Sequence, residues 1–455
     1  MSPRSALRGR AQTAFVLGIG LLFLAGVLLE VPYVNGPWYW RWPWRDLGVL
    51  PTAFHLLPGL VPLAWALRRM SLDGARVSPR QILALLTAAC LLHQIFGFVA
   101  DPNGYRMLRD IVASPGATSY YTDALHIRST LDFLAGFHAA PLHLHSSTHP
   151  PGPILYYRFW IWVLGPEAGA YAGGTVLLVL AAAGVPAVHA FAHLWTSDRI
   201  DRLYAAALYS LLPGLLLISP EFDQVYPLFS MGIVGAWVLS MDGHRRAAPA
   251  LGAVLFVALL FAYNLLTIGA FLVLHAGALL WRRPDRRGTL KLILRTSAVA
   301  MGVWAGLLLL FHLATEYRPV ASFASALDTQ ARLADSHGRP WLACVLFDPY
   351  DFALGAGIMA VPLALIFAGR TLRSCGPLTR AEGLSLLGFA TIAVVDVSGL
   401  LRAETARVWL FLQPFIVIPA ALVLARWRTS DRAAFFALQW LIVVVLKTKM
   451  AFVIP

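Results

Sequence analysis

Charge is scarce in this sequence. Only 13% of the 455 residues are Asp, Glu, Lys or Arg, against roughly 25% in an ordinary soluble domain, whereas 58% are hydrophobic. This composition excludes a soluble enzyme. The three cysteines, Cys90, Cys344 and Cys375, form neither a CxxC nor a Cys/His metal spacing, so the sequence supports no disulfide framework and no structural zinc. The P-loop, GxSxG and HExxH motifs are also absent.

Long apolar runs dominate what is present. We predict an all-α polytopic membrane protein that forms a single domain over residues 1–455, with about 13 transmembrane helices of about 20 residues each. The first run follows several arginines but is long for a signal peptide and lacks a clear cleavage site, so we expect it to be retained. The predicted spans cover residues 13–33, 49–67, 81–100, 170–195, 203–219, 225–241, 248–264, 265–281, 292–312, 353–369, 383–401, 408–425 and 433–450.

The distribution of basic residues predicts the orientation of these spans. If the N-terminus is cytoplasmic, the inner segments carry 22 Lys and Arg residues and the outer segments carry 11, and cytoplasmic loops are the ones that accumulate these residues. Much of the net charge of +13 is therefore a topology signal rather than a nucleic-acid surface. The great excess of Arg over Lys indicates a GC-rich bacterial genome, so we predict a bacterial plasma (inner) membrane protein.

Two long loops, residues 101–169 and 313–352, then lie on the outer face, and long loops often carry function. In the first, residues 105–112 and 127–137 have apolar stripes at helical spacing, which predicts two juxtamembrane helices lying in the interface. Five histidines fall between positions 126 and 149, but no carboxylate stands at a recognised ligand spacing, so a metal site is disfavoured against sugar or phosphate contacts or plain loop polarity. The aromatic cluster at 38–44 is typical of a headgroup belt.

The first outer loop also carries two motifs that share a resemblance. These are Tyr121-Thr122-Asp123 and the segment from His149 to Tyr157, HPPGPILYY, which runs into an aromatic helix. Together they resemble the start of the GT-C glycosyltransferases, most closely the protein mannosyltransferase and aminoarabinose transferase type. The resemblance implies a GT-C-like fold over about residues 81–425, Asp123 as the general base and His149, Tyr121 and Tyr157 near the substrate. Ala124 stands where many relatives have a second acid.

A carboxylate suits the role of base because it is ionised near neutral pH and needs only hydrogen-bond reach of the acceptor hydroxyl. The alternative is that Asp123 caps a helix over residues 124–137.

Two further groups of charged residues fall on the predicted outer face. Glu221 and Asp223 follow the Ser219-Pro220 turn, where the resemblance implies an acidic residue that contacts substrate or a divalent ion; Asp223 matches better than Glu221. A simple solvated turn is the alternative.

The second group lies around residues 396–407. Asp396 lies within a predicted span, where ionisable groups are costly and usually paired or functional. Glu404 and Arg407 are spaced i, i+3 and could pair. Arginine binds phosphate through two parallel bonds, so we assign Arg407, with Arg402 second, to the phosphate of a lipid-linked sugar. The alternative is a snorkelling Arg beside a helix-capping Glu.

The second outer loop contains further polar residues that predict either a lid selecting the acceptor or an ordinary polar loop. They are Asp328, Arg332, Asp335, His337, Arg339, Asp348 and Asp351.

These features predict a glycosyltransferase that moves a sugar from a polyprenyl-phosphate donor to an acceptor hydroxyl on the outer face. Nucleotide sugars are scarce outside the cytoplasm, so a lipid-borne donor explains an outward site. The expected partners are the lipid-linked sugar, a glycan, lipid or protein acceptor and membrane lipids, with no nucleic acid. The sequence requires no cofactor and leaves a divalent cation open. The alternatives are a transporter or flippase for a lipid-linked or anionic substrate, and a polysaccharide polymerase or ligase.

Overall fold

The computed structural model describes residues 3–72, 78–336 and 338–455, without the side chains of residues 3–8 and 334–336. His337 and the side chain of Asp335 therefore lie outside the described part of the chain. Within it every extended element is a helix, and the one β-type pairing is an isolated bridge between Trp44 and Met450. This confirms the all-α prediction.

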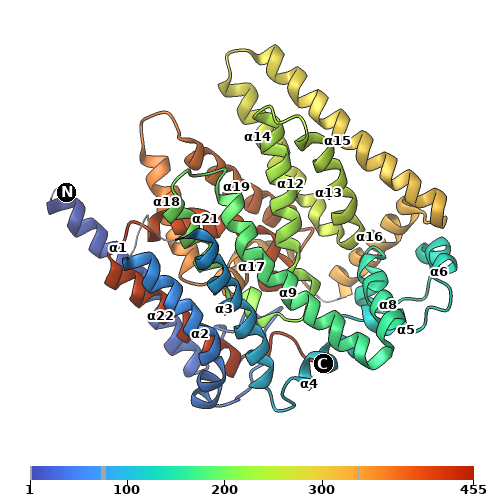
Figure 1. The fold of residues 1–455 in the computed structure, drawn as a ribbon, viewed down its shortest axis with the longest axis horizontal. Helices are drawn as coiled ribbons and strands as arrows, with labels where there is room; N and C mark the ends of the chain where they lie inside the picture. The colour runs from blue at the N-terminus through green and yellow to red at the C-terminus, as the bar shows by residue number, and fades with distance from the viewer. Residues whose placement is uncertain (1–2, 73–77, 337) are drawn as a thin grey trace.

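Long helices pack side by side in a bundle, and shorter helices connect them (Figure 1). They are α1 (Pro3–Leu28), α2 (Val49–Leu72), α3 (Pro79–Val99), α4 (Arg106–Ala113), α5 (Tyr120–Leu125), α6 (Thr130–Gly136), η2 (Phe137–Ala139), α7 (Leu144–Ser147), α8 (Gly152–Leu164), α9 (Pro166–Ala192), α10 (Arg199–Tyr209), α11 (Pro213–Leu217), η3 (Phe222–Gln224), α12 (Tyr226–Met241), α13 (Ala247–Phe261), η4 (Tyr263–Ile268), α14 (Gly269–Arg282), α15 (Arg286–Thr315), α16 (Pro319–Ser336), α17 (Trp341–Ala356), α18 (Ala360–Arg373), α19 (Arg380–Ser398), α20 (Thr405–Val408), η5 (Leu410–Leu412), α21 (Pro414–Leu424) and α22 (Thr429–Lys449).

The chain is a multi-pass membrane protein. Nine helices in its described part are long and apolar enough to cross a bilayer, and a tenth crossing forms if α17 and α18, bent by 114° at their junction, act as one span. The predicted count of 13 is not confirmed. Proline accounts for part of the difference, because it lacks the backbone N–H that a helix interior needs: Pro213 begins α11 and divides the predicted span 203–219, and Pro414 begins the short α21.

The loops contact one another as the predicted topology requires. On the face assigned to the cytoplasm, Arg380 pairs with Asp242 at 2.7 Å, and Arg426 pairs with Asp201 at 2.9 Å. On the opposite face, Arg45 pairs with Asp101 at 3.0 Å. Because these pairs join segments that the charge pattern places on the same side, the contacts agree with the predicted alternation of the spans.

The helices at the two ends of the chain pack together. Helix α22 lies against α1 and α2, and α2 packs along α3, at the side of the molecule where the blue and red segments meet in Figure 1. Helix α13 packs on both α12 and α15, and α14 and α12 join these helices to the rest of the bundle through α19 and α9. Helix α21 packs against α10, α18 and α19, and almost all of its side chains are buried.

The first outer loop forms the helices expected of it. Helices α4 and α6 match the two amphipathic segments, and α4 buries its apolar stripe, including Leu108 and Ile111. The capping alternative for Asp123 is wrong, because Asp123 lies inside α5 and the cap of α6 is Ser129.

Two other expectations need correction. Trp42, from the aromatic cluster assigned to the headgroup belt, is only 3% exposed and donates its indole N–H to Asp351 at 2.7 Å, whereas Trp38 is 56% exposed as a belt residue should be. The polar residues Asp348 and Asp351 do not lie in a loop but inside α17, where both are buried. Buried polar groups retain hydrogen bonds, and here the aromatic segment supplies them.

Candidate functional site

A cluster of charged side chains gathers around Arg407 at the end of the bundle assigned to the outer face. The Arg407 guanidinium contacts Glu404 at 3.0 Å and Asp223 at 3.9 Å, and all three side chains are only 15–16% exposed. The i, i+3 pairing of Glu404 with Arg407 is therefore confirmed. Arg339 contacts the other oxygen of Glu404 at 3.1 Å. We call Arg407, Glu404, Asp223, Arg339 and the neighbouring Glu221 the Arg407 cluster.

The Arg407 cluster contains polar atoms without partners. The Nε of Arg407 and the Oε1 of Glu221 are buried and make no hydrogen bond within the described part of the chain. Burial lowers the pKa of Arg407, but the carboxylates of Glu404, Asp223 and Glu221 outweigh this effect and raise it, so the guanidinium stays charged. A buried charged donor without a partner is costly, and a bound anion is one way to satisfy it.

Glu221 lies beside these charges and is only 2% exposed. Burial raises its pKa to about 8, and the attraction of Arg407 offsets only part of that rise. Glu221 is thus mainly protonated at neutral pH. Its backbone N–H donates to Gln224, which in turn donates to Gln94 of α3 at 3.0 Å, so this turn is tied to a neighbouring span.

Helix α17 holds the segment that carries Glu404 and Arg407. Asp348 accepts the backbone N–H of Ala403 at 3.1 Å, and Asp351 accepts the backbone N–H of Ala406 at 3.0 Å and the hydroxyl of Thr405 at 3.2 Å. Ala403 and Glu404 both adopt left-handed backbone, with φ of 60° and 53°. Such conformations cost energy in residues other than glycine, and the buried carboxylates compensate through charge-assisted hydrogen bonds.

Aromatic and imidazole side chains from the first outer loop border the Arg407 cluster. The ring of Tyr120 lies 5.4 Å from that of His149 and 5.7 Å from that of Phe222, which precedes Asp223. Burial and the charge of Arg407 lower the pKa of both His145 and His149 to about 4. The two imidazoles are therefore neutral at pH 7 and add polarity without adding charge.

Asp123 is buried and pairs with a histidine. Its carboxylate accepts from Nδ1 of His143 at 2.6 Å and from the backbone N–H of His143 at 3.3 Å. The Asp123 side chain is 6% exposed and that of His143 is 43% exposed. We call these two residues the Asp123–His143 pair.

The other predicted site residues have structural partners. Arg402 donates to the carbonyls of Gly399 at 2.8 Å and Arg339 at 3.3 Å, and no contact within the described residues joins it to Arg407. Asp396 is half-buried near the end of α19, and its Oδ1 has no partner there. The predicted residues Asp223, Glu221, Glu404 and Arg407 therefore lie together, whereas Arg402 contacts the carbonyl of Arg339 and it is Arg339 that contacts Glu404.

The two tyrosines predicted to lie near the substrate mainly make packing contacts. Tyr121 donates its hydroxyl to the carbonyl of Pro166, and its ring lies 5.8 Å from that of Tyr157. Tyr157 is fully buried, and its hydroxyl has no partner within the described residues. Both residues join α5 to α8 and so fix the position of the loop segment that carries Asp123.

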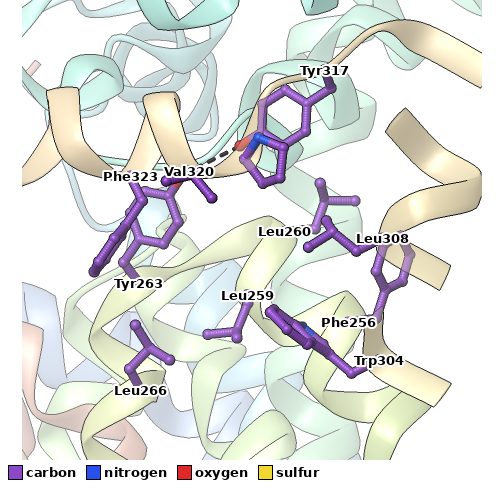
Figure 2. Close-up of a pocket in the computed structure, with 11 residues that line it drawn as sticks. Phe256, Leu259, Leu260, Tyr263, Leu266, Trp304, Leu308, Tyr317, Val320 and Phe323 are labelled. Atoms are coloured by element: carbon purple, nitrogen blue, oxygen red, sulfur yellow. Dashed lines mark hydrogen bonds between the residues drawn. The ribbon is translucent and has the colours of Figure 1, made fainter. Parts of the chain in front are cut away.

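An apolar cavity of about 280 Å³ lies between α13, η4, α15 and α16 (Figure 2). Figure 2 shows Phe256 and Trp304 on one side and, on the other, Tyr263 and Tyr317, whose hydroxyls lie 3.3 Å apart. Asn264, which follows Tyr263 in η4, donates to the carbonyl of Val408 at 3.5 Å. This contact joins one wall of the cavity to the residue after Arg407.

Within the described part of the chain, no three His, Cys, Asp or Glu side chains are arranged to hold a metal ion. We therefore derive no step through a divalent cation. The chain matches no protein-family model, and no curated protein matches its sequence.

Sequence reasoning placed Arg339 in the second outer loop without its contact to Glu404, and it did not single out His143 or Tyr120. Arg339 meets Glu404 across 65 residues and His143 meets Asp123 across 20, so no local spacing signals either pair. Tyr120 had a weak signal, since it lies three residues before Asp123 and such residues share a helix face.

Proposed function

We propose that this protein is an integral membrane glycosyltransferase of GT-C type that transfers a sugar from a polyprenyl-phosphate donor to an acceptor hydroxyl. The observation that carries the proposal is the buried Nε of Arg407, which makes no hydrogen bond within the described residues and contacts Asp223 only at 3.9 Å. A donor phosphate can take this N–H while Arg407 keeps its 3.0 Å contact with Glu404, because the contact to Asp223 is loose at 3.9 Å. Arg407 would neutralise the phosphate as it leaves.

The apolar cavity of Figure 2 supports a lipid-linked donor. It is lined almost entirely by Leu, Phe, Trp and Tyr side chains and adjoins the Arg407 segment through Asn264 and Val408. We assign it to the isoprenoid chain next to the phosphate. Burying apolar surface stabilises by about 25 cal/mol per Å², so even a short stretch of chain would contribute to donor affinity.

The remaining steps fall to neighbouring carboxyl groups. Asp223 and Glu221 would bind sugar hydroxyls, and the acceptor proton would be taken at the Asp123–His143 pair. A single displacement at the anomeric carbon would invert its configuration. The Arg407 cluster would face the outside of a bacterial plasma membrane, with the N-terminus in the cytoplasm.

The test is sugar transfer by the purified full chain in detergent, with a radiolabelled polyprenyl-phosphate sugar as donor. We expect transfer by the wild type and a loss of about 100-fold or more in Arg407→Ala, because one preorganised donor at a developing charge typically contributes that much. Arg332→Ala is the matched control, since this arginine pairs with Asp328 on α16 in an exposed position. Equal transfer by Arg407→Ala and wild type would refute the assignment of Arg407.

A transporter or flippase would use the same charged groups for binding. It is disfavoured because Glu404 and Arg407 follow α19 and Asp223 lies at the start of the candidate span Phe222–Met241, so the Arg407 cluster gathers at the ends of spans, whereas transport sites lie near the bilayer midplane. Proteoliposomes that move the lipid-linked sugar across the bilayer without consuming it would favour that class. A polymerase or ligase would transfer a preassembled glycan in the same assay.

A further inference from the structure

The Asp123–His143 pair exposes its two members unequally. The carboxylate of Asp123 is 6% exposed and is occupied by two donors of His143, whereas the imidazole is 43% exposed. An acceptor hydroxyl therefore meets the imidazole first, because little of the carboxylate is open to solvent.

The hydrogen bond between the two residues fixes which nitrogen of His143 carries the proton. An ionised carboxylate only accepts, so the 2.6 Å contact places a proton on Nδ1. In the neutral form of the ring, which a general base requires, the other nitrogen, Nε2, carries the lone pair. It has no hydrogen-bond partner within the described residues.

The surrounding loop holds this geometry from both sides. Ser119, immediately before α5, and Ser146 of α7 join their hydroxyls at 2.9 Å, and the backbone N–H of Ser146 donates to Ser119 at 3.1 Å. The segments that carry Asp123 and His143 are thus fastened to each other at a second point. These contacts hold the imidazole of His143 in one position, and a general base must be positioned within hydrogen-bond reach of the proton that it takes.

Tyr120 links the Asp123–His143 pair to the residues beside the Arg407 cluster. Tyr120 and Asp123 are spaced i, i+3 in α5, which places them about 5–6 Å apart on one helix face. Tyr120 in turn contacts His149 and the residue before Asp223. His145, two residues after His143, is close enough to Arg407 and Glu404 to feel their charges, so the loop segment that carries His143 borders the side of the Arg407 cluster where the proposed sugar would bind.

We propose that Nε2 of His143 is the atom that accepts the acceptor proton, and that Asp123 is a positioning residue that orients the imidazole and stabilises its protonated form. This inference rests on the proposed glycosyltransferase function. As the acceptor oxygen forms its bond to the anomeric carbon, the bond from that carbon to the phosphate oxygen breaks and the phosphate leaves with the electron pair. The acceptor O–H bond breaks and its proton moves to Nε2. The exposed ring then returns the proton to water.

The experiment compares kcat and donor KM of His143→Ala, His143→Asn and Asp123→Asn with those of the wild type, with and without added imidazole. We expect kcat of both His143 variants to fall by about 100-fold or more with donor KM unchanged, the range for general-base catalysis. Added imidazole should raise the kcat of His143→Ala by at least about tenfold, because the exposed position of His143 leaves room for it. His126→Ala is the matched control, an exposed histidine of the same loop that bonds only the carbonyl of Thr122.

The outcomes separate the two proposals. A wild type that transfers no sugar would refute the glycosyltransferase function itself. With an active wild type, His143→Ala within about threefold of it, or a His143→Ala loss that imidazole does not restore, would overturn the role of His143. His143→Asn keeps a donor for Asp123 but no proton acceptor, so an active His143→Asn would overturn it as well.

Discussion

At the scale of single residues, Arg407 shows how a buried guanidinium can be prepared for an anion. Glu404 holds it on one side and Asp223 lies loosely on the other. The pairing with Glu404 could be predicted from the i, i+3 spacing, because both partners lie in one short segment. The second cation could not, because Arg339 comes from a segment 65 residues away and its contact depends on how α16 and α17 fold back.

Arg407→Lys tests the geometry of this residue separately from its charge. We expect donor KM to rise by about tenfold with a smaller effect on kcat, because lysine keeps the charge but loses the planar fork that binds phosphate through two N–H groups. Donor saturation curves measure this effect. An unchanged KM would mean that charge alone accounts for the role of Arg407.

Glu221 gives the site a predicted dependence on pH. Burial raises its pKa to about 8, so below that pH the carboxyl is neutral and above it a negative charge appears beside Arg407, Asp223 and Glu404. We expect donor KM of the wild type to rise as the pH passes about 8, because the added charge repels the phosphate. In Glu221→Gln the rise should be absent, and a wild-type profile that stays flat from pH 7 to 9 would contradict the assignment.

At the scale of elements, α17 packs against the segment that carries Arg407 and holds it in place. Its approach to the Arg407 segment is so close that a Cβ on Gly355 would lie 2.2 Å from the carbonyl oxygen of Ala406. The sequence placed the first half of this helix in a polar loop because Asp348 and Asp351 look like loop residues. Their true partners are the backbone of residues 403–406 and the distant Tyr39 and Trp42, and hydropathy carries no information about such contacts.

Gly355→Ala tests this support. We expect it to lower the free energy of unfolding by about 1–3 kcal/mol, as overpacking typically does, and to reduce sugar transfer by moving Arg407. Gly369→Ala in α18 is the matched control, since a Cβ there meets nothing within 4 Å. Thermal unfolding in detergent and the transfer assay together measure the effect. Gly355→Ala with wild-type stability and activity would show that the close approach is unimportant.

At the scale of the whole molecule, hydropathy predicted the all-α bundle with many membrane spans, and the sides that the charge pattern assigns to the loops stay a prediction. Hydropathy did not predict the number of spans, because α10 with α11, α13 and α21 are shorter than a bilayer is thick and rely on neighbouring helices for their burial. Which helices pack beside a short helix depends on the folded structure, and the hydropathy of that one segment does not show it.

Cys375 tests the predicted orientation without any substitution. It is the one exposed cysteine, while Cys90 and Cys344 are buried, and it lies between α18 and α19 on the predicted cytoplasmic face. A membrane-impermeant maleimide should label inside-out vesicles and leave right-side-out vesicles unlabelled. Cys375→Ser, which should not be labelled in either preparation, is the control. Labelling only from the outside would reverse the topology and place the Arg407 cluster in the cytoplasm.

The packing of α22 against α1 and α2 has a consequence for synthesis. Lys449, at the end of α22, reaches Glu30 across 419 residues, and Lys447 pairs with Asp101 at 2.6 Å. Because α22 is synthesised after them, α1 and α2 lack the helix that they pack against until α22 leaves the ribosome. A chain interrupted before α22 would leave α1 and α2 without the helix they pack against and Asp101 without Lys447, and incompletely packed chains are prone to misassembly.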